Sequence, residues 1–283
     1  MTYAAYEGSR TLGAPINLYK FTCGTLAFRY TDHEFAVVLA GETFVPIPID
    51  RGKITESGTM DKKTMQVGFP HTVEIANLFL AAPPSDIVTL KVWGGHADDP
   101  DGEFKVVWTG RVLSCSRKKT TAELTCEPIS TSMKRNGLRR RYQFGCPFVL
   151  YGPDCKASKA AFSVSTTVAA ISGSRIALPA GWTSRDPAKY LDGLVEWTND
   201  SGNREVRTIK RVEGDGTTLL LSYIPRELYV GHTVSVVPGC NHKAGIAAQP
   251  DGDCGPVFGN ILNFGGQPWI PFKNPIGLVN NYY

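Results

Sequence analysis

Cysteines in glycine- and proline-rich loops place the strongest constraint on how this chain folds. Cys146 and Cys155 form one pair, and Cys240 and Cys254 form a second pair much further along the sequence. Glycine or proline stands close to each of these cysteines. Such neighbours let backbone amides turn toward sulfur while keeping bulky side chains away. If both pairs belong to one site, that site closes only through tertiary folding.

The residues alone leave three interpretations of these cysteines open: a shared metal or cluster site, buried thiols without a ligand, or disulfides. Their spacing does not match the C-x2-C knuckles of zinc ribbons and fingers, so it identifies no metal. Four thiolates suit either Zn²⁺ or a cubane iron–sulfur cluster. His242 follows closely after Cys240, but a single loop histidine is usually solvated, and it is left out of the predicted ligand set.

Composition limits the class of protein. The chain has 283 residues, of which 42% are apolar, and this is enough material for two modest cores. The formal net charge of +4 is too small for a dedicated nucleic-acid binder. The sequence shows no signal segment and no apolar run of roughly 18 residues, so assembly in a cytoplasm without membrane insertion is expected.

The total of seven cysteines argues against a complete disulfide framework, because an odd number cannot pair fully. The redox setting of a cytoplasm instead favours thiols or metal ligands. Cys23, Cys115 and Cys126 fall within or at the ends of predicted strands, where small buried thiols are common. These three are predicted to be buried and without a ligand.

The pattern of apolar residues predicts a mainly β protein in two parts. Residues 73–82 carry the single helical stripe, which Pro83 and Pro84 end. Short segments rich in β-branched and aromatic residues predict strands. These segments are 16–22, 26–31, 86–93, 104–113, 122–126, 194–198, 206–212 and 217–223. We place the domain boundary so that residues 1–134 form an N-terminal β-rich region and residues 135–283 a C-terminal β-domain.

Two further segments are unusual in composition. Lys134, Arg135, Arg139, Arg140 and Arg141 form a basic run, which is interpreted as a solvated face or an interface with neighbouring proteins. Contact with DNA is expected to be absent or transient. Residues 255–283 are rich in aromatics and have Lys273 as their single ionisable side chain. The part from Phe258 to Trp269 is predicted to pack near the cysteines, and the end of the chain to reach a partner.

Catalytic motifs are not found in the sequence, and the chain is not expected to be an enzyme. The nearest candidate for a thiol hydrolase is Cys155 with His232, and it arises only by elimination. Asp98, Asp99 and Asp101 are interpreted as part of a surface turn with Pro100 and Gly102 and not as a Ca²⁺ loop.

The residues around the cysteines resemble a known family. The stretches RRRYQFGCPFVLYGPDCKAS and PGCNHKAG, followed by GDCGPVFGNILNFGGQPWIP, are similar to the C-terminal region of BR0599-type phage tail proteins. The preceding half resembles their DUF2163-type N-terminal region. Members of this type are similar to minor tail protein L of lambda-like phages and to the hubs of gene transfer agents.

The resemblance implies a structural virion protein at the tip of a long, non-contractile tail. It implies an N-terminal oligomerising region and a [4Fe–4S] cluster held by Cys146, Cys155, Cys240 and Cys254. The expected partners are other copies in a ring, a trimer by the resemblance, with a distal tail ring protein and a central receptor-facing hub or fibre protein. A zinc-stabilised assembly protein is the alternative from another class.

Overall fold

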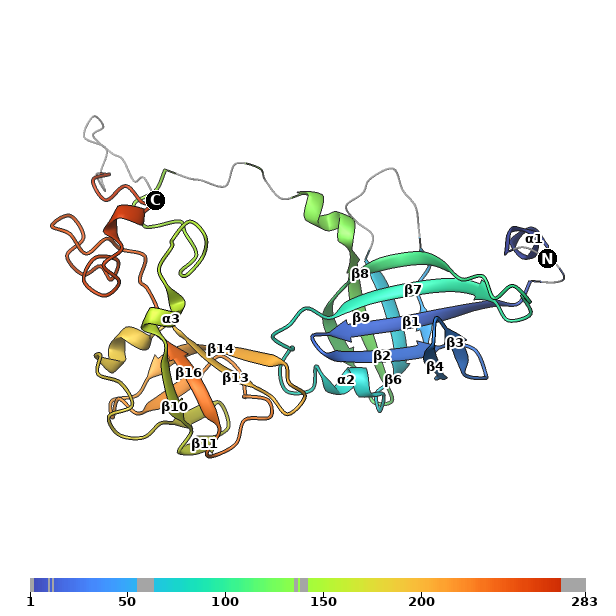
Figure 1. Ribbon diagram of the computed structural model, residues 1–283, viewed down its shortest axis with the longest axis horizontal. Helices are drawn as coiled ribbons and strands as arrows, with labels where there is room; N and C mark the ends of the chain where they lie inside the picture. The colour runs from blue at the N-terminus through green and yellow to red at the C-terminus, as the bar shows by residue number, and fades with distance from the viewer. Residues whose placement is uncertain are drawn as a thin grey trace. The chain divides into compact units, whose positions relative to one another are not determined.

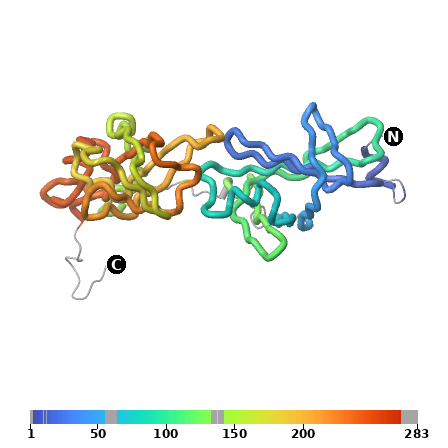
Figure 2. The backbone as a smooth tube through the Cα atoms, turned by 90° about the horizontal axis from the view of Figure 1, so that it is seen from below, coloured from blue at the N-terminus to red at the C-terminus, as the bar shows by residue number. Residues whose placement is uncertain are grey.

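The computed structural model describes residues 3–9, 11, 13–54, 64–134, 137 and 142–270. The chain divides into two compact units (Figures 1 and 2). The first unit consists of Met1–Arg135 together with Thr198–Glu205, and the second consists of Asn136–Trp197 and Val206–Tyr283. The described residues are mainly β, which confirms the predicted class. Among them, no helix has the length and apolar character needed to cross a membrane.

The first unit is built on a nine-stranded sheet that rolls up on itself. Its strand order is β3-β4-β2-β1-β7-β8-β9-β6-β5. Only residues 47–49 separate β4 from β5, and the four residue steps from Pro46 to Asp50 span at most about 14 Å. The two ends of the sheet must therefore lie close together. The strands are β1 (Pro15–Cys23), β2 (Leu26–Thr31), β3 (Val37–Leu39), β4 (Glu42–Pro46), β5 (Asp50–Arg51), β6 (Met65–Pro70), β7 (Thr89–His96), β8 (Lys105–Arg117) and β9 (Thr121–Pro128).

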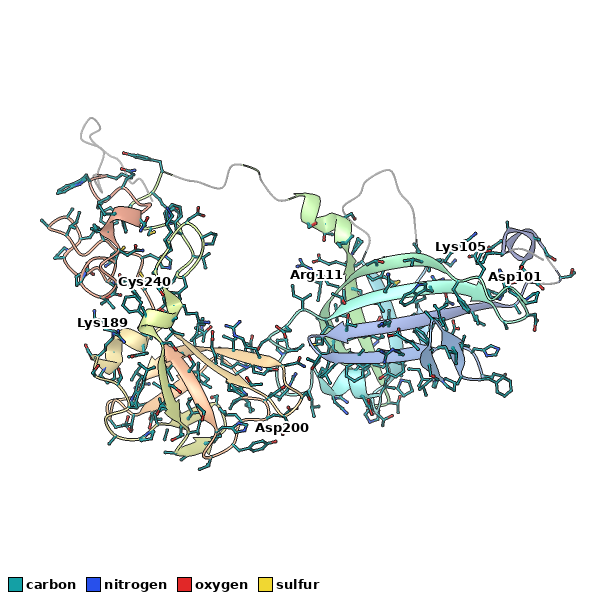
Figure 3. The ribbon with its side chains drawn as sticks, viewed as in Figure 1. Asp101, Lys105, Arg111, Lys189, Asp200 and Cys240 are labelled. Carbon is teal, nitrogen blue, oxygen red and sulfur yellow. The ribbon has the colours of Figure 1, made fainter. Side chains whose placement is uncertain are left out.

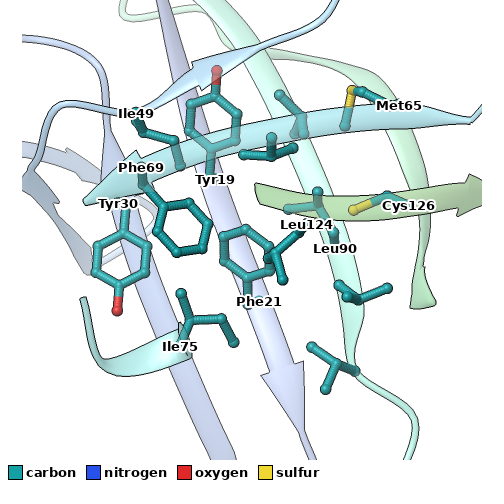
Figure 4. Close-up of a cluster of buried hydrophobic side chains, with 14 of the residues drawn as sticks. Tyr19, Phe21, Tyr30, Ile49, Met65, Phe69, Ile75, Leu90, Leu124 and Cys126 are labelled. Carbon is teal, nitrogen blue, oxygen red and sulfur yellow. The ribbon is translucent and has the colours of Figure 1, made fainter. Parts of the chain in front are cut away.

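Alternating apolar residues of these strands form the core of the first unit. Figure 4 shows Tyr19 and Phe21 of β1 with Leu90 of β7 and Leu124 of β9 in one buried cluster. All four are fully buried. Ile75 from the short helix α2 (Glu74–Asn77) joins the same cluster and is also fully buried. The period-2 pattern read from the sequence thus corresponds to side chains that point inward.

The predicted helix over residues 73–82 is too long. The observed helix α2 covers only Glu74–Asn77, and no side chain caps its N-terminus. Leu80, which the helical stripe placed on the apolar face, is 68% exposed. Val73, Leu78 and Phe79 still pack against the core outside the helix, so apolar spacing that meets the core does not by itself extend the helix.

Several elements of the first unit were not predicted. These are helix α1 (Tyr3–Gly8), the 3-10 helix η1 (Ile129–Lys134) and the strands β3 to β6. Helix α1 has no buried residue, and it is held by Tyr3 and Tyr6, whose rings lie 5.5 and 5.4 Å from that of His96. Such a contact joins residues far apart in sequence, so local patterns do not reveal it. The predicted strand at 86–93 begins later, as β7 at Thr89.

An ion cluster on strands β1, β2 and β4 gives a pH-dependent prediction. Glu42 accepts hydrogen bonds from Lys20 Nζ at 2.6 Å and Arg29 Nη2 at 2.8 Å. The Arg29 and Lys20 hydrogen bonds lower the pKa of Glu42 from 4.5 to about 2. A lowered pKa means that ionised Glu42 stabilises the folded state above pH 4.5, and that this contribution is lost as the pH falls toward 2.

Glu42→Gln is expected to flatten the fall in unfolding free energy between pH 4.5 and about 2. The effect should be small, because the three side chains are partly exposed. Urea unfolding at several pH values measures it, and substitution of the exposed Glu34 by Gln is the matched control. Equal acid sensitivity of the Glu42→Gln variant and the unsubstituted protein would contradict the prediction.

The second unit is also a rolled sheet. Its seven strands have the order β10-β16-β13-β14-β15-β12-β11, and only residues 168–169 separate the two end strands β10 and β11. The core contains Trp182, Tyr190, Trp197 and Ile209. The strands are β10 (Val164–Thr167), β11 (Ala170–Ser172), β12 (Arg175–Ala177), β13 (Leu194–Thr198), β14 (Arg204–Val212), β15 (Thr218–Leu221) and β16 (Thr233–Val237).

Two long loop regions extend from this second sheet. Residues 142–158 precede helix α3 (Lys159–Phe162), and residues 238–270 follow β16 and contain the 3-10 helix η3 (Ile261–Asn263). A further 3-10 helix, η2 (Pro187–Tyr190), precedes β13. Backbone hydrogen bonds join the loop regions to each other, including Gln267 N to Gln143 O at 2.8 Å. The two loop regions therefore form one subassembly, which contains both cysteine pairs.

Candidate functional site

The two cysteine pairs line a single pocket in the second unit. Cys146, Cys155, Cys240 and Cys254 all belong to its wall, and Cys240 is labelled in Figure 3. The remaining lining residues are Phe148, Leu150, His242, Phe258, Asn260 and Asn263. The structure thus brings together four side chains that the sequence places in two distant loops.

The first loop is shaped by unusual backbone conformations. Tyr151 and Lys156 have positive φ values of 61° and 58°, on either side of Cys155. The Tyr151 hydroxyl donates to the carbonyl of Pro238 at 2.8 Å, just before the second loop begins. Non-glycine residues rarely adopt this left-handed conformation, so the surrounding contacts must hold it in place.

The second loop is held by two buried polar side chains. Asp253 accepts from Lys189 Nζ at 2.8 Å and from the backbone N–H of Asn241 at 3.1 Å. Gln249 is 2% exposed, accepts from Ala244 N at 2.6 Å and donates to Phe144 O at 3.0 Å. Because Phe144 belongs to the first loop region, Gln249 joins the two loop regions beside the cysteines.

Two N–H groups point at sulfur atoms of the pocket. The backbone N–H of His242 donates to Cys240 Sγ at 3.4 Å, and Asn260 Nδ2 donates to Cys155 Sγ at 3.5 Å. Hydrogen bonds of this kind stabilise negative charge on sulfur, and they occur around cysteine-ligated metal groups.

The surroundings of two pocket thiols, Cys240 and Cys254, disfavour the ionised form of the sulfur. Burial raises the pKa of Cys254 to about 11, and the neighbouring thiols Cys240, Cys146 and Cys155 add to the shift. Burial also raises the pKa of Cys240, while its hydrogen bond from His242 works in the opposite direction. Deprotonation of several of these thiols together would need a compensating positive charge.

Apolar side chains close the pocket on the side of the second sheet. Phe258 is 8% exposed, and its ring lies 4.9 Å from that of Phe162 and 6.1 Å from that of Tyr151. This confirms the expected packing at the start of the segment 258–269. The expectation is wrong for Trp269, which is 73% exposed.

The other three cysteines belong to the first unit and do not line the pocket. Cys23 and Cys126 are buried, as predicted, and burial raises the pKa of Cys126 to about 12. Cys115 is only half-buried, which corrects the expectation for this residue. None of the seven cysteines, all of which lie in the described part of the chain, forms a disulfide.

Within the described ranges, no three His, Cys, Asp or Glu side chains are arranged as ligands of one metal ion. The four cysteines share a pocket wall, but their role as ligands stays a prediction. His242 was interpreted as a solvated histidine outside the ligand set, and its side chain is exposed, as expected. Although exposed, it lines the pocket, and its Nδ1 lies 3.0 Å from Cys146 O. The sequence signal that could have identified His242 as a pocket residue is its position two residues after Cys240.

Two other sequence interpretations have clear outcomes. Asp99 is buried and accepts from the N–H groups of Asp101 and Glu103 at 3.1 and 3.2 Å, so it stabilises a turn, as predicted. His232 packs against Tyr229 and does not line the pocket of Cys155. The side chains of the basic run 134–141 and the chain end at 271–283 lie outside the described residues.

Comparison with known families finds two matches along the chain. Residues 10–158 match a family described as "Baseplate hub protein, N-terminal attachment domain". Residues 188–274 match a family described as "Phage conserved hypothetical protein BR0599". The second match contains Cys240 and Cys254, and the first contains Cys146 and Cys155.

Two individual proteins are also similar. An uncharacterized protein of Xylella fastidiosa (strain 9a5c) is 27% identical over 183 residues, which are 60% of this chain and 38% of that protein. The match therefore spans well under half of that relative. A chain in a structure titled "Virion of native gene transfer agent (GTA) particle" covers 95% of this chain and 92% of its own length, with a TM-score of 0.73 and 19% identity. This likeness shows a shared fold.

Proposed function

The chain belongs to the family of baseplate hub proteins that carry the N-terminal attachment domain, and we propose that it forms a ring at the tip of a long, non-contractile tail. Membership makes it a structural component of the baseplate of a phage or phage-derived particle. The match over residues 10–158 is the observation that carries the proposal, because it covers nearly all of the first unit.

We assign attachment and ring formation to the first unit. Its partners would be further copies of the chain, proposed as a trimer, and the distal ring protein of the tail. The second unit would face the central hub or fibre protein. A rolled sheet suits such a role, because closing the sheet leaves few unpaired strand edges for unwanted association.

We further propose that the second unit binds a [4Fe–4S] cluster through Cys146, Cys155, Cys240 and Cys254. Three observations support the fit. Four thiols line one pocket, N–H groups donate to the sulfurs of Cys155 and Cys240, and apolar side chains shield one side. When bound, the cluster would link the two loop regions covalently through its thiolate bonds. The surrounding residues would position the thiols and limit the access of water and oxidants.

Anaerobic purification of the whole chain tests the cluster. The expected result is a brown protein with a broad absorption near about 400 nm and about four irons per chain. A colourless sample with about one zinc per chain would show the alternative, a zinc-stabilised assembly protein.

The place in the particle is tested separately. Labelling of the chain in particles of its own phage or gene transfer agent should mark the distal end of the tail and no other part. Particles made without the chain should lack the tip structure. A label along the tail tube or on the head would contradict the proposed position, whatever the metal content.

A further inference from the structure

The pocket cysteines are joined in two separate pairs by the protein itself. His242 makes the first connection. Its carbonyl accepts from Cys146 N at 2.8 Å, and its ring Nδ1 lies 3.0 Å from Cys146 O. A carbonyl oxygen only accepts, so Nδ1 must donate in this contact. The backbone N–H of the same residue donates to Cys240 Sγ. His242 therefore contacts one cysteine from each loop.

Asn260 makes the second connection in a similar way. Its backbone N–H donates to Cys254 O at 2.9 Å, and its side chain Nδ2 donates to Cys155 O at 2.6 Å and to Cys155 Sγ at 3.5 Å. Asn263 Nδ2 donates to Asn260 Oδ1 at 2.7 Å. This contact and the bond to the Cys155 carbonyl together fix the orientation of the Asn260 side-chain amide, with Nδ2 toward Cys155 and Oδ1 toward Asn263. Asn260 thus links Cys155 to Cys254.

We propose that His242 and Asn260 are positioning residues that hold the four cysteines as two preformed pairs, Cys146 with Cys240 and Cys155 with Cys254, in the iron-free protein. Each pair crosses between the two loop regions, so neither loop provides a complete pair by itself. The inference rests on the proposed function for the identity of the metal group. The two cysteine pairs themselves are defined by contacts within the chain, whichever metal group is bound.

Two features support preformed pairs. Each of these contacts joins two groups of the chain itself, so none of them passes through a metal. Gln249 adds an independent buried connection between the same two loop regions.

The test is the alkylation rate of each thiol in iron-free, reduced full-length protein, read by mass spectrometry of the labelled peptides. Asn260→Ala removes the side-chain bonds to Cys155. It should raise the rate at Cys155 about fivefold or more and leave Cys146 and Cys240 near their original rates. His242→Gly removes the ring but tolerates the positive φ of 58° at this position. It should raise the rate at Cys146 and leave Cys155 unchanged.

The matched control is Asn77→Ala, an exposed asparagine in α2 of the first unit, which should leave all four rates unchanged. An equal rise at all four thiols, or no rise at the paired one, would overturn the inference. If Asn260→Ala does not fold, Asn260→Asp keeps the shape and removes the donor. The same Cys155-selective rise is then required.

A second measurement uses the cluster. With the cluster loaded, Asn260→Ala should lower the reduction potential, because it removes an N–H donor to a ligand sulfur. His242→Gly should leave the potential near its original value, because the backbone N–H to Cys240 remains. An equal potential in Asn260→Ala and the unsubstituted protein would refute the sulfur contact of Asn260. If the protein binds no iron, the proposed cluster fails, while the alkylation pattern still decides the pairing.

Discussion

Cys240→Ser is expected to reduce iron from about four atoms per chain to fewer than about one and to stop the formation of functional tails. Cys240 lines the pocket with three other cysteines and receives the N–H of His242. A serine hydroxyl is a poor ligand for iron in this setting, because soft thiolates are preferred. Loss of the cluster would remove the bonds that it makes between the two loop regions.

The measurements are iron content, absorption near about 400 nm and the titre of complete particles. Cys115→Ser is the matched control, because Cys115 lies in β8 of the first unit, does not line the pocket and is half-buried. It should keep the iron content and the titre. Full iron content in the Cys240→Ser protein would exclude this cysteine as a ligand. Full titre without iron would show that the cluster is dispensable for assembly.

Gly239→Ala is expected to destabilise the second unit by about 3 kcal/mol without changing any thiol. A Cβ at position 239 would lie 1.9 Å from Leu191 O and 2.7 Å from Gly193 N. Both atoms belong to the backbone just before β13, so they cannot turn away like a flexible side chain. Gly239 N also donates to Lys189 O at 3.1 Å, and this bond fixes where the loop of Cys240 begins.

Urea unfolding followed by tryptophan fluorescence measures the loss of stability, because Trp182 and Trp197 lie in the core of the second unit. Iron content should fall in parallel. Gly214→Ala is the matched control, since a Cβ at position 214 would meet no atom within 4 Å. The change in its unfolding free energy should be within about 0.5 kcal/mol. A Gly239→Ala protein as stable as this control would show that the backbone at 191–193 can move aside.

The strand pattern was predictable where alternation continues over many residues. Tyr19, Phe21 and Cys23 of β1 belong to the core and alternate with the partly exposed Lys20 and Thr22, as expected. The short strands β3, β5 and β11 were missed, because two or three residues carry no readable period. The predicted helix at 73–82 was too long: Val73, Leu78 and Phe79 pack against the core outside the single helical turn that forms, so apolar spacing did not fix the helix length.

The cysteine loops also have some features that the sequence reveals and others that only the folded structure shows. Glycine, proline and the cysteines themselves identify the loops as a site in the sequence, and the neighbouring residues carry the family resemblance. His242, Gln249 and Asn260 gain their roles only through contacts with the other loop region. No local pattern encodes such contacts, since a hydrogen bond between distant segments depends on how the whole unit folds.

The sequence by itself determined the mainly β class, the position of the strongest strands and the cysteines that form the candidate site, because each follows from local chemistry. Only the tertiary structure decided that both sheets close on themselves, through the short connections at 47–49 and 168–169. It alone also decided that the four cysteines line one pocket and are joined across the loops as Cys146 with Cys240 and Cys155 with Cys254. The physical reason is that sheet closure and pocket contacts join residues far apart in the chain, and their geometry is set when the core packs.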